Sequence, residues 1–135
     1  MIFGIGVDTV DIGRFERSLD RTPKLRERLF TERERELPVS SLAARFAAKE
    51  ALIKALGDSH GLAWHDMEVF RGEDRAPSFA QTEPLLRELQ RLGAGRTHLS
   101  MTHDAGVATA FVIVESAGAL AANSSANAEV NGDEK

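Results

Sequence analysis

Two carboxylates and a lysine are the side chains of this sequence whose types and spacing could do chemistry together. Asp8 lies near the end of an alternating stretch at the N-terminus, and Glu50 and Lys54 lie four residues apart in an alanine-rich segment. Two acids held apart on a strand and a helix make a reasonable Mg²⁺ site, because magnesium prefers oxygen ligands and keeps several waters. A hard cation completed by substrate phosphates, with a lysine nearby, is the usual equipment for attack at phosphorus.

Each of these residues also has an ordinary structural explanation. Glu50 and Lys54 have the i,i+4 spacing of a common stabilising pair on a helix. Asp8 could cap a following helix, and considered alone that is its commoner role. His103, at the end of a later strand, is more often a surface histidine than a functional one. The sequence has no Ser-His-Asp order, P-loop or His-rich zinc pattern, so acyl hydrolysis and P-loop phosphoryl transfer lack support.

The segment from Arg45 to Gly57 is predicted to be a central helix, because it consists mostly of strong helix formers. Ser40 and Ser41 offer N-cap oxygens ahead of it, and Gly57 is a natural residue to end it. At about 100° per residue, an apolar stripe forms from Leu42, Phe46, Ile53 and Leu56.

Two charged residues of this helix lie close to that stripe. Lys49 falls inside it, and Glu50 lies about 40° from Phe46. A plain surface helix would keep such charges on the opposite face, so Glu50 should point toward whatever the helix packs on. A metal ion or another cation would offset the cost of burying the carboxylate.

The N-terminal strand, residues 1–10, alternates with period two. Gly4 and Gly6 lie on the face that ends in Asp8, and the larger apolar residues lie on the other. Two missing side chains beside an acid leave open space along the backbone, as a ligand or a second chain would need. The Gly-Ile-Gly run is too short for a dinucleotide fingerprint.

The remaining elements complete an α+β fold with a mostly antiparallel sheet packed against the long central helix. Residues 118–135 show no periodic core signal and are expected to form a disordered tail, which leaves a single domain in residues 1–117. Before the central helix, we expect a helix over Ile12–Leu19, a second helix from Pro23, and a solvated stretch with a possible capping box over Thr31–Glu36. After it, we expect a hairpin of Met67–Phe70 with Ser78–Phe79 and a helix over Thr82–Leu92. Two closing strands follow, over His98–His103 and Val107–Val114, and the second of these is expected to be central in the sheet.

The composition excludes several classes of protein. The chain has 135 residues, which suits one domain, with 42% hydrophobic and 28% charged residues and no cysteine. It therefore has no disulfide or thiolate site, and a cytoplasmic location is expected. No apolar run approaches the roughly 20 residues of a transmembrane helix, and no signal peptide opens the chain. The net charge of -4 argues against nucleic acid as the main partner.

The positive charge is concentrated in one stretch. Between Arg14 and Arg28 there are six basic residues against three acids. This excess on an otherwise acidic chain suggests a docking surface for an acidic partner. A solvated helical face with mixed ion pairs explains the pattern equally well.

Three blocks of the sequence carry a family resemblance. They are Gly4-Ile5-Gly6-Val7-Asp8, Arg45-Phe46-Ala47-Ala48-Lys49-Glu50-Ala51-Leu52-Ile53-Lys54-Ala55 and Ser100-Met101-Thr102-His103. Together they resemble the signature blocks of the holo-[acyl-carrier-protein] synthases, the short single-domain 4′-phosphopantetheinyl transferases. The blocks follow the family's order at compatible spacing over roughly residues 1–116. The middle block is the specific one.

The resemblance implies a function and a role for each matching residue. A family member transfers 4′-phosphopantetheine from coenzyme A to a serine of an acyl carrier protein or of a carrier domain in a fatty acid synthase. Asp8 and Glu50 match the Mg²⁺ ligands. Beyond the resemblance, we hypothesise that a carboxylate takes the serine proton, with Glu50 as the candidate, directly or through a metal-bound water. The family's contacts with coenzyme A correspond to Arg45, Lys54, Gly57 and His103. Its contacts with the acidic helix of the carrier protein correspond to Arg14, Arg21 and Lys24.

The family also implies a homotrimer with active sites between subunits, for which the glycine face of the first strand could be the close contact. Two loops depart from the family pattern: Leu56-Gly57-Asp58-Ser59-His60-Gly61 replaces a Phe-Gly-Thr-Gly continuation, and Arg75-Ala76-Pro77 replaces Gly-x-Pro. A non-catalytic module that binds coenzyme A or a carrier, and a Mg²⁺ enzyme acting on another pyrophosphate, remain alternatives.

Overall fold

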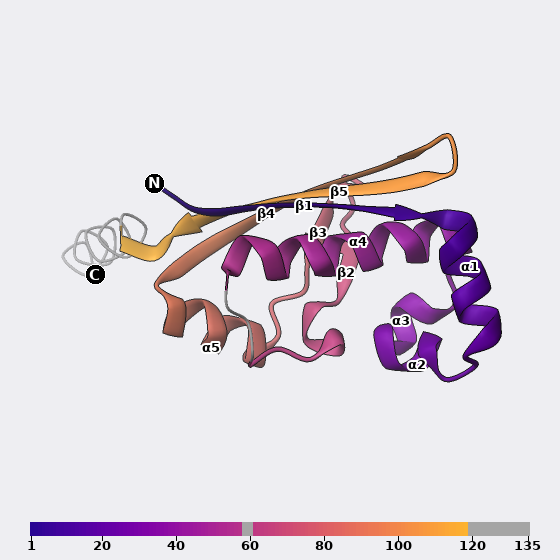
Figure 1. The fold of residues 1–135 in the computed structure, drawn as a ribbon. Coiled ribbons are helices and arrows are strands. Elements are labelled where there is room, and N and C mark those ends of the chain that lie inside the picture. Colours follow the sequence, from indigo (N-terminus) through magenta and orange to yellow (C-terminus); the bar gives the residue numbers. More distant parts are fainter. Residues whose placement is uncertain (58–60, 119–135) are drawn as a thin grey trace.

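An antiparallel sheet of three strands lies over one long helix in the computed structural model, which describes residues 1–57 and 61–118. The strand order is β1 (Ile2–Asp11), β5 (Val107–Ser116), β4 (Ala94–Asp104), so the last strand of the chain lies between the other two. The long helix α4 (Val39–Leu56) runs under β1 and β5 (Figure 1). The predicted α+β fold and the central position of β5 are confirmed.

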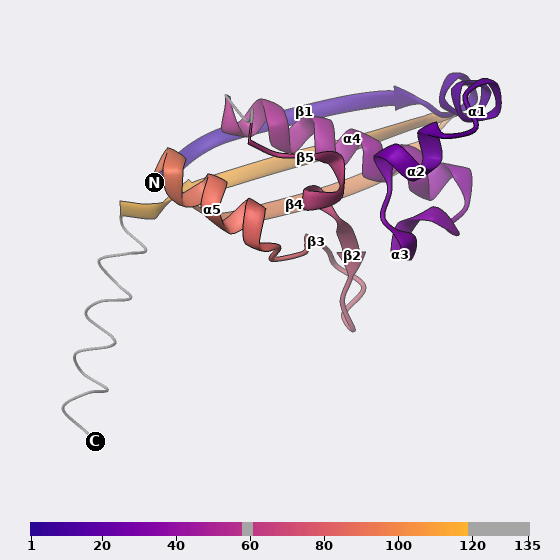
Figure 2. The same ribbon diagram turned by 90° about the horizontal axis from the view of Figure 1, so that it is seen from below.

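Shorter elements cover the two ends of α4 (Figures 1 and 2). Three helices lie at one end, a fourth lies at the other, and a small hairpin projects between them. These elements are α1 (Ile12–Arg21), α2 (Leu25–Leu29), α3 (Glu32–Arg35), the 3-10 helix η1 (Trp64–Met67), β2 (Val69–Arg71), β3 (Pro77–Phe79) and α5 (Glu83–Leu92). The hairpin and α5 were both predicted, and the Thr82 hydroxyl caps α5 as expected.

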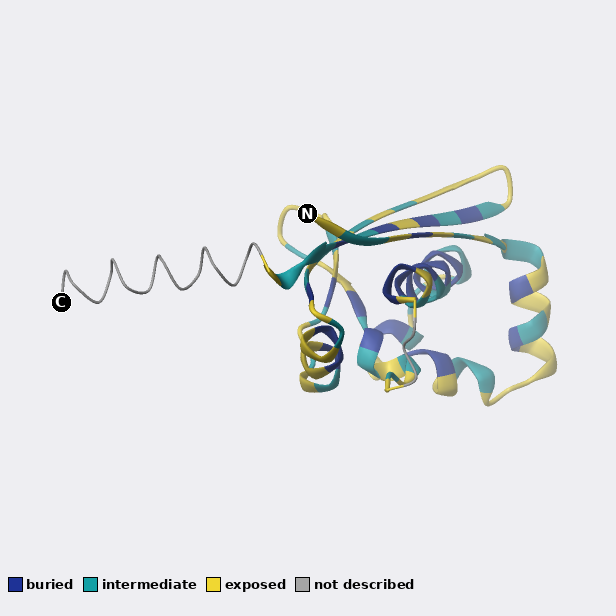
Figure 3. Ribbon diagram, turned by 60° about the vertical axis from the view of Figure 1, so that its left-hand side comes forward, coloured by how far each residue is buried: buried dark blue, intermediate teal, exposed yellow. Residues whose placement is uncertain are grey.

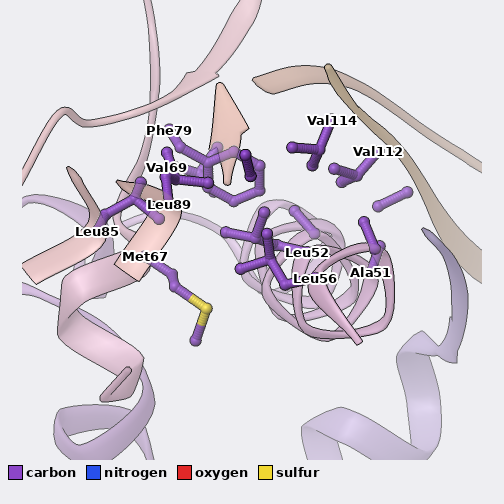
Figure 4. Packing of buried hydrophobic residues seen from close by; sticks show 14 of the residues in the cluster. Ala51, Leu52, Leu56, Met67, Val69, Phe79, Leu85, Leu89, Val112 and Val114 are labelled. Carbon is purple, nitrogen blue, oxygen red and sulfur yellow. The ribbon is translucent and has the colours of Figure 1, made fainter. Parts of the chain in front are cut away.

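Helix α4 is buried on nearly every side, because sheet, hairpin and short helices surround it. Six alanines between Ala43 and Ala55 are buried, and Leu52 and Leu56 pack with Val112 and Val114 of β5 (Figure 4). Figure 3 shows the buried residues concentrated on α4 and β5. The single apolar stripe expected for this helix is therefore too narrow a description.

The two ends of α4 differ in how well they could be predicted. Gly57 ends the helix with φ 78° and donates its N–H to the carbonyls of Ile53 and Lys54, as expected of a glycine there. The N-cap prediction at Ser40 and Ser41 is wrong. The helix begins at Val39, directly after Pro38, whose φ of -58° already has a helical value.

The glycine face of β1 lies against the backbone of α4. A Cβ added to Gly4 would lie 1.8 Å from the Ala55 carbonyl oxygen, and one added to Gly6 would lie 1.8 Å from that of Ala51. The expectation that this face leaves space for a ligand or a second chain is wrong, because the chain's own helix fills it. The close approach places Asp8, two residues further on, beside α4.

Asp11, and not Asp8, caps helix α1. Its carboxylate accepts the Arg14 N–H at 2.8 Å, so Asp8 has no capping role there. The solvated pattern expected over Thr31–Glu36 is also wrong at Glu34, whose side chain is buried. The alternating charges of that stretch are typical of a solvated surface and do not indicate that the Glu34 side chain faces inward.

Arg75 explains one departure from the family pattern. Its φ is 66°, in the left-handed region that favours glycine, and it lies in the turn between β2 and β3. The glycine that the family has at this position is therefore explained by the backbone conformation. Arginine in the same conformation has a backbone strain energy of about 1 kcal/mol. The other departure, at Asp58–His60, and the predicted tail at residues 119–135 lie outside the described residues. No helix in the described part is long and apolar enough to cross a membrane.

Candidate active site

Strand β1 and helix α4 bring Asp8, Glu50 and Lys54 together. The Lys54 ammonium donates to Asp8 Oδ1 at 3.1 Å and to the Val7 carbonyl at 3.0 Å. Burial, and then the negative charge of Asp8, raise the pKa of Glu50, while Lys54 acts in the opposite direction. The two carboxylates are therefore close enough to interact where β1 meets α4, and Lys54 forms an ion pair with Asp8 there.

An open cavity of about 340 Å³ lies beside this cluster. Asp8 and Glu50 line it together with Arg14, which belongs to the predicted carrier contacts. Phe15 and Phe46, stacked with ring centroids 5.2 Å apart, form its apolar wall. Neither phenylalanine was predicted as a site residue, although Phe46 was assigned to the apolar stripe of the central helix. Their positions on two amphipathic segments are the signal that could have found them.

The donor set of the cavity fits Mg²⁺ better than zinc. Three carboxylates line it, and one of them, Asp11, already caps α1, which leaves Asp8 and Glu50 as the donors. Nowhere in residues 1–57 and 61–118 do three or more His, Cys, Asp or Glu side chains form a metal-binding cluster. Magnesium is commonly held by one or two carboxylates, with waters and substrate phosphates completing its shell. Burial, and then the negative charge of Asp8, raise the pKa of Glu50, and a divalent cation would offset both effects by stabilising the ionised carboxylate.

The other predicted contacts with coenzyme A lie apart from these carboxylates. Arg45 is buried on the side of α4 that packs against β2, where its Nε donates to the Val69 carbonyl at 3.3 Å. His103 is exposed on β4 and pairs with Ala108, which in turn pairs with Val10, so strand β5 separates it from β1. Gly57 is exposed at the end of α4, three residues after Lys54.

The predicted carrier contacts lie at the cavity end of the molecule. Arg14 and Arg21 are exposed on α1, and Lys24 is exposed directly before α2. Helices α1 and α2 lie together at one end of the fold (Figure 2). The basic surface and the cavity are therefore adjacent, with Arg14 common to both.

Comparison with known proteins defines the class. The family model described as the 4′-phosphopantetheinyl transferase superfamily matches residues 4–111. The chain belongs to this superfamily. A holo-[acyl-carrier-protein] synthase of Leifsonia xyli subsp. xyli is 62% identical over 115 residues, which are 85% of this chain and 98% of that protein.

Solved structures agree with the sequence relatives. The crystal structure of holo-[acyl-carrier-protein] synthase from Neisseria meningitidis has a TM-score of 0.79 and 31% identity, covering 85% of this chain and 99% of that one. The enzyme of Helicobacter pylori, in complex with coenzyme A, has a TM-score of 0.73 and 31% identity, covering 82% and 99%. Within its superfamily, the chain belongs to the holo-[acyl-carrier-protein] synthases, which confirms the resemblance found in the sequence.

Proposed function

We propose that this protein transfers 4′-phosphopantetheine from coenzyme A to a serine of an apo acyl carrier protein or carrier domain, in fatty acid biosynthesis and in the cytoplasm. The observation that carries the proposal is the meeting of Asp8, Glu50 and Lys54 at a cavity that Arg14 also lines. Membership of the synthase family supports the same activity. Coenzyme A in the Helicobacter pylori relative supports it as the donor.

The proposed reaction is an attack on phosphorus. The serine oxygen bonds to the β-phosphorus of coenzyme A, the bond to the bridging oxygen breaks, and 3′,5′-adenosine bisphosphate leaves with that electron pair. Glu50 takes the serine proton, directly or through an intervening water. The Lys54 side chain is 56% exposed, so its ammonium can turn from Asp8 to a phosphate oxygen at low cost.

Asp8 and Glu50 are the residues that would hold Mg²⁺. When bound, the cation would neutralise charge on the pyrophosphate. The proposed contacts of Arg45, Gly57 and His103 with coenzyme A, and of Arg14, Arg21 and Lys24 with the carrier, remain predictions. Arg14 is the first of these to test, because it lines the cavity that the carboxylates share.

We also propose a homotrimer with active sites between subunits, the number three resting on the family resemblance. Ile5, Val7 and Phe111 are 54%, 50% and 42% exposed on the sheet face opposite α4. Val7 pairs with Phe111 across β1 and β5, so the apolar residues are contiguous. A patch of this kind on a sheet face marks a contact surface. Within one chain, β5 separates His103 from Asp8. In a trimer, the His103 of a neighbouring subunit could instead approach the Asp8 site.

The transfer reaction has a direct test. Apo acyl carrier protein, coenzyme A and Mg²⁺ are mixed with the protein, and the intact carrier is weighed by mass spectrometry. We expect a gain of one phosphopantetheine that EDTA abolishes and excess Mg²⁺ restores. A gain that persists in EDTA would contradict the metal site. No gain on a free carrier or on a synthase carrier domain would favour a binding module, and loss of coenzyme A without modified carrier would favour another pyrophosphate reaction.

The oligomer proposal is tested by placing a charge on the open sheet face. Phe111→Arg places a charge without a partner in an apolar contact through this face, so we expect a smaller particle in analytical ultracentrifugation and lower activity. Leu86→Arg is the matched control, because Leu86 is 46% exposed on α5, away from this face. A wild-type protein that sediments as one chain at assay concentration would refute the trimer.

A further inference from the structure

Lys49 is a buried cation with no part in the proposed chemistry, although it precedes Glu50 directly in the chain. Its side chain is 0% exposed, and its ammonium donates three hydrogen bonds. The acceptors are Glu34 Oε1 at 2.7 Å, the Leu29 carbonyl at 2.7 Å and the Trp64 carbonyl at 3.2 Å. All three ammonium hydrogens are thus used, each on a different element from α4.

Glu34 extends this contact to two more places in the chain. Its Oε1 also accepts the Thr31 N–H at 3.1 Å, and its Oε2 accepts the Val69 N–H at 2.9 Å. The ion pair of Lys49 with Glu34 therefore joins the end of α2, the start of α3, the 3-10 helix and the start of β2 to the middle of α4. Stability alone is a poor explanation for it, because a buried pair loses hydration that its attraction offsets only in part.

A chain of aromatic contacts runs from this pair to the active-site cavity. Lys49 Nζ lies 5.1 Å from the ring centroid of Phe30, which follows Leu29 and is completely buried. The Phe30 ring meets Phe15 of α1 edge to face, with centroids 6.1 Å apart. Phe15 lines the cavity and follows Arg14 in the chain. The position of α1 thus depends on where Lys49 holds the end of α2.

We propose that Lys49 is a positioning residue, which sets where the basic surface of α1 and α2 lies relative to Asp8 and Glu50. The proposal rests on the proposed function, since that surface matters here as the contact for the carrier protein. Helix α4 then directs Glu50 toward β1 and Lys49 toward α2. One rigid helix determines both the reacting groups and the orientation in which the carrier serine arrives.

The test removes both charges at matched length. In Lys49→Met/Glu34→Gln neither partner of the ion pair is left without the other, but buried Arg45 loses the nearby negative charge of Glu34, and the Leu29 and Trp64 carbonyls lose their donor. Steady-state kinetics are measured with apo carrier and with coenzyme A varied separately. We expect the KM for the carrier to rise about tenfold, with kcat at saturating carrier and the KM for coenzyme A changed less than about twofold.

A control separates positioning from general destabilisation. Leu89→Ala opens the core under α5, in a different cluster from α1 and α2, so it lowers the melting temperature while the KM for the carrier stays unchanged. If the double variant keeps the wild-type KM for the carrier, the proposal is overturned. The same holds if kcat and both KM values change together. Wild-type protein that transfers nothing would instead refute the proposed function, and with it the docking role.

A second variant serves if the double variant fails to fold. Phe30→Leu keeps the ion pair but removes the aromatic contact with Phe15. We expect it too to raise the KM for the carrier without a matching change in the KM for coenzyme A. A folded Phe30→Leu protein with an unchanged KM for the carrier would overturn the proposed connection between Lys49 and α1.

Discussion

Replacing Glu50 by glutamine is expected to lower the rate of phosphopantetheine transfer by about a thousandfold or more, because it removes a proposed proton acceptor and metal ligand at once. The fold should keep its stability. A carboxyl whose pKa is raised in the folded state destabilises that state once it ionises, and glutamine avoids this penalty. Transfer is measured by mass spectrometry of the carrier, and stability by thermal unfolding without metal.

Glu73→Gln is the matched control for this substitution. Glu73 is exposed in the turn between β2 and β3, away from the cavity. The activity and the melting temperature of the Glu73→Gln protein should therefore equal those of the wild type. Turnover of Glu50→Gln within about tenfold of the wild type would rule out the proposed base, since a general base contributes more than that.

Replacing Gly6 by alanine is expected to destabilise the protein by about 3 kcal/mol or more, which lowers the melting temperature by about 10 °C or more. The new Cβ would lie 1.8 Å from the Ala51 carbonyl oxygen. The conflict is with helix backbone, so no side-chain rotation relieves it, and α4 must move away from β1. Activity of the folded fraction should fall as well, because that movement separates Asp8 from Glu50. Thermal unfolding and the transfer assay measure the two effects.

Gly13→Ala is the matched control, because it makes the same substitution at a position where a Cβ has room. A Cβ there would lie 3.4 Å from the end of the flexible Arg17 side chain, inside helix α1. Alanine favours a helix over glycine by about 1 kcal/mol, so stability should stay equal or rise. If Gly6→Ala melted like Gly13→Ala, the close approach of α4 to β1 would be refuted.

The sequence predicted the features that depend on local pattern. Alternation of apolar residues located β1, and a run that is apolar on both faces located β5. Gly57 and Thr82 marked helix ends because capping uses neighbouring residues. The grouping of Asp8 with Glu50 as a possible Mg²⁺ site followed from their residue types and was strengthened by the family resemblance, and the structure places both at one cavity. Spacing alone left Asp8 open to a capping role that Asp11 performs.

The errors have a common physical origin, which is that tertiary contacts decide them. The missing side chains of Gly4 and Gly6 imply a close neighbour, but nothing local says that this neighbour is α4. Glu34 lies among alternating charges typical of a solvated turn, and its burial depends on Lys49, fifteen residues later. The separation of Arg45 from Asp8 likewise results from the packing of β2 against α4.

The order of strands has a consequence for synthesis on the ribosome. β1 is the first strand to be translated, and it pairs with β5, which ends at Ser116. Until that last strand emerges, Asp8 lies on a segment without its sheet partner. Pairing across such a sequence separation is slow to form. A nascent chain should therefore bring its proposed metal ligands into working geometry only after nearly the whole domain has left the exit tunnel, and prematurely terminated chains should be inactive.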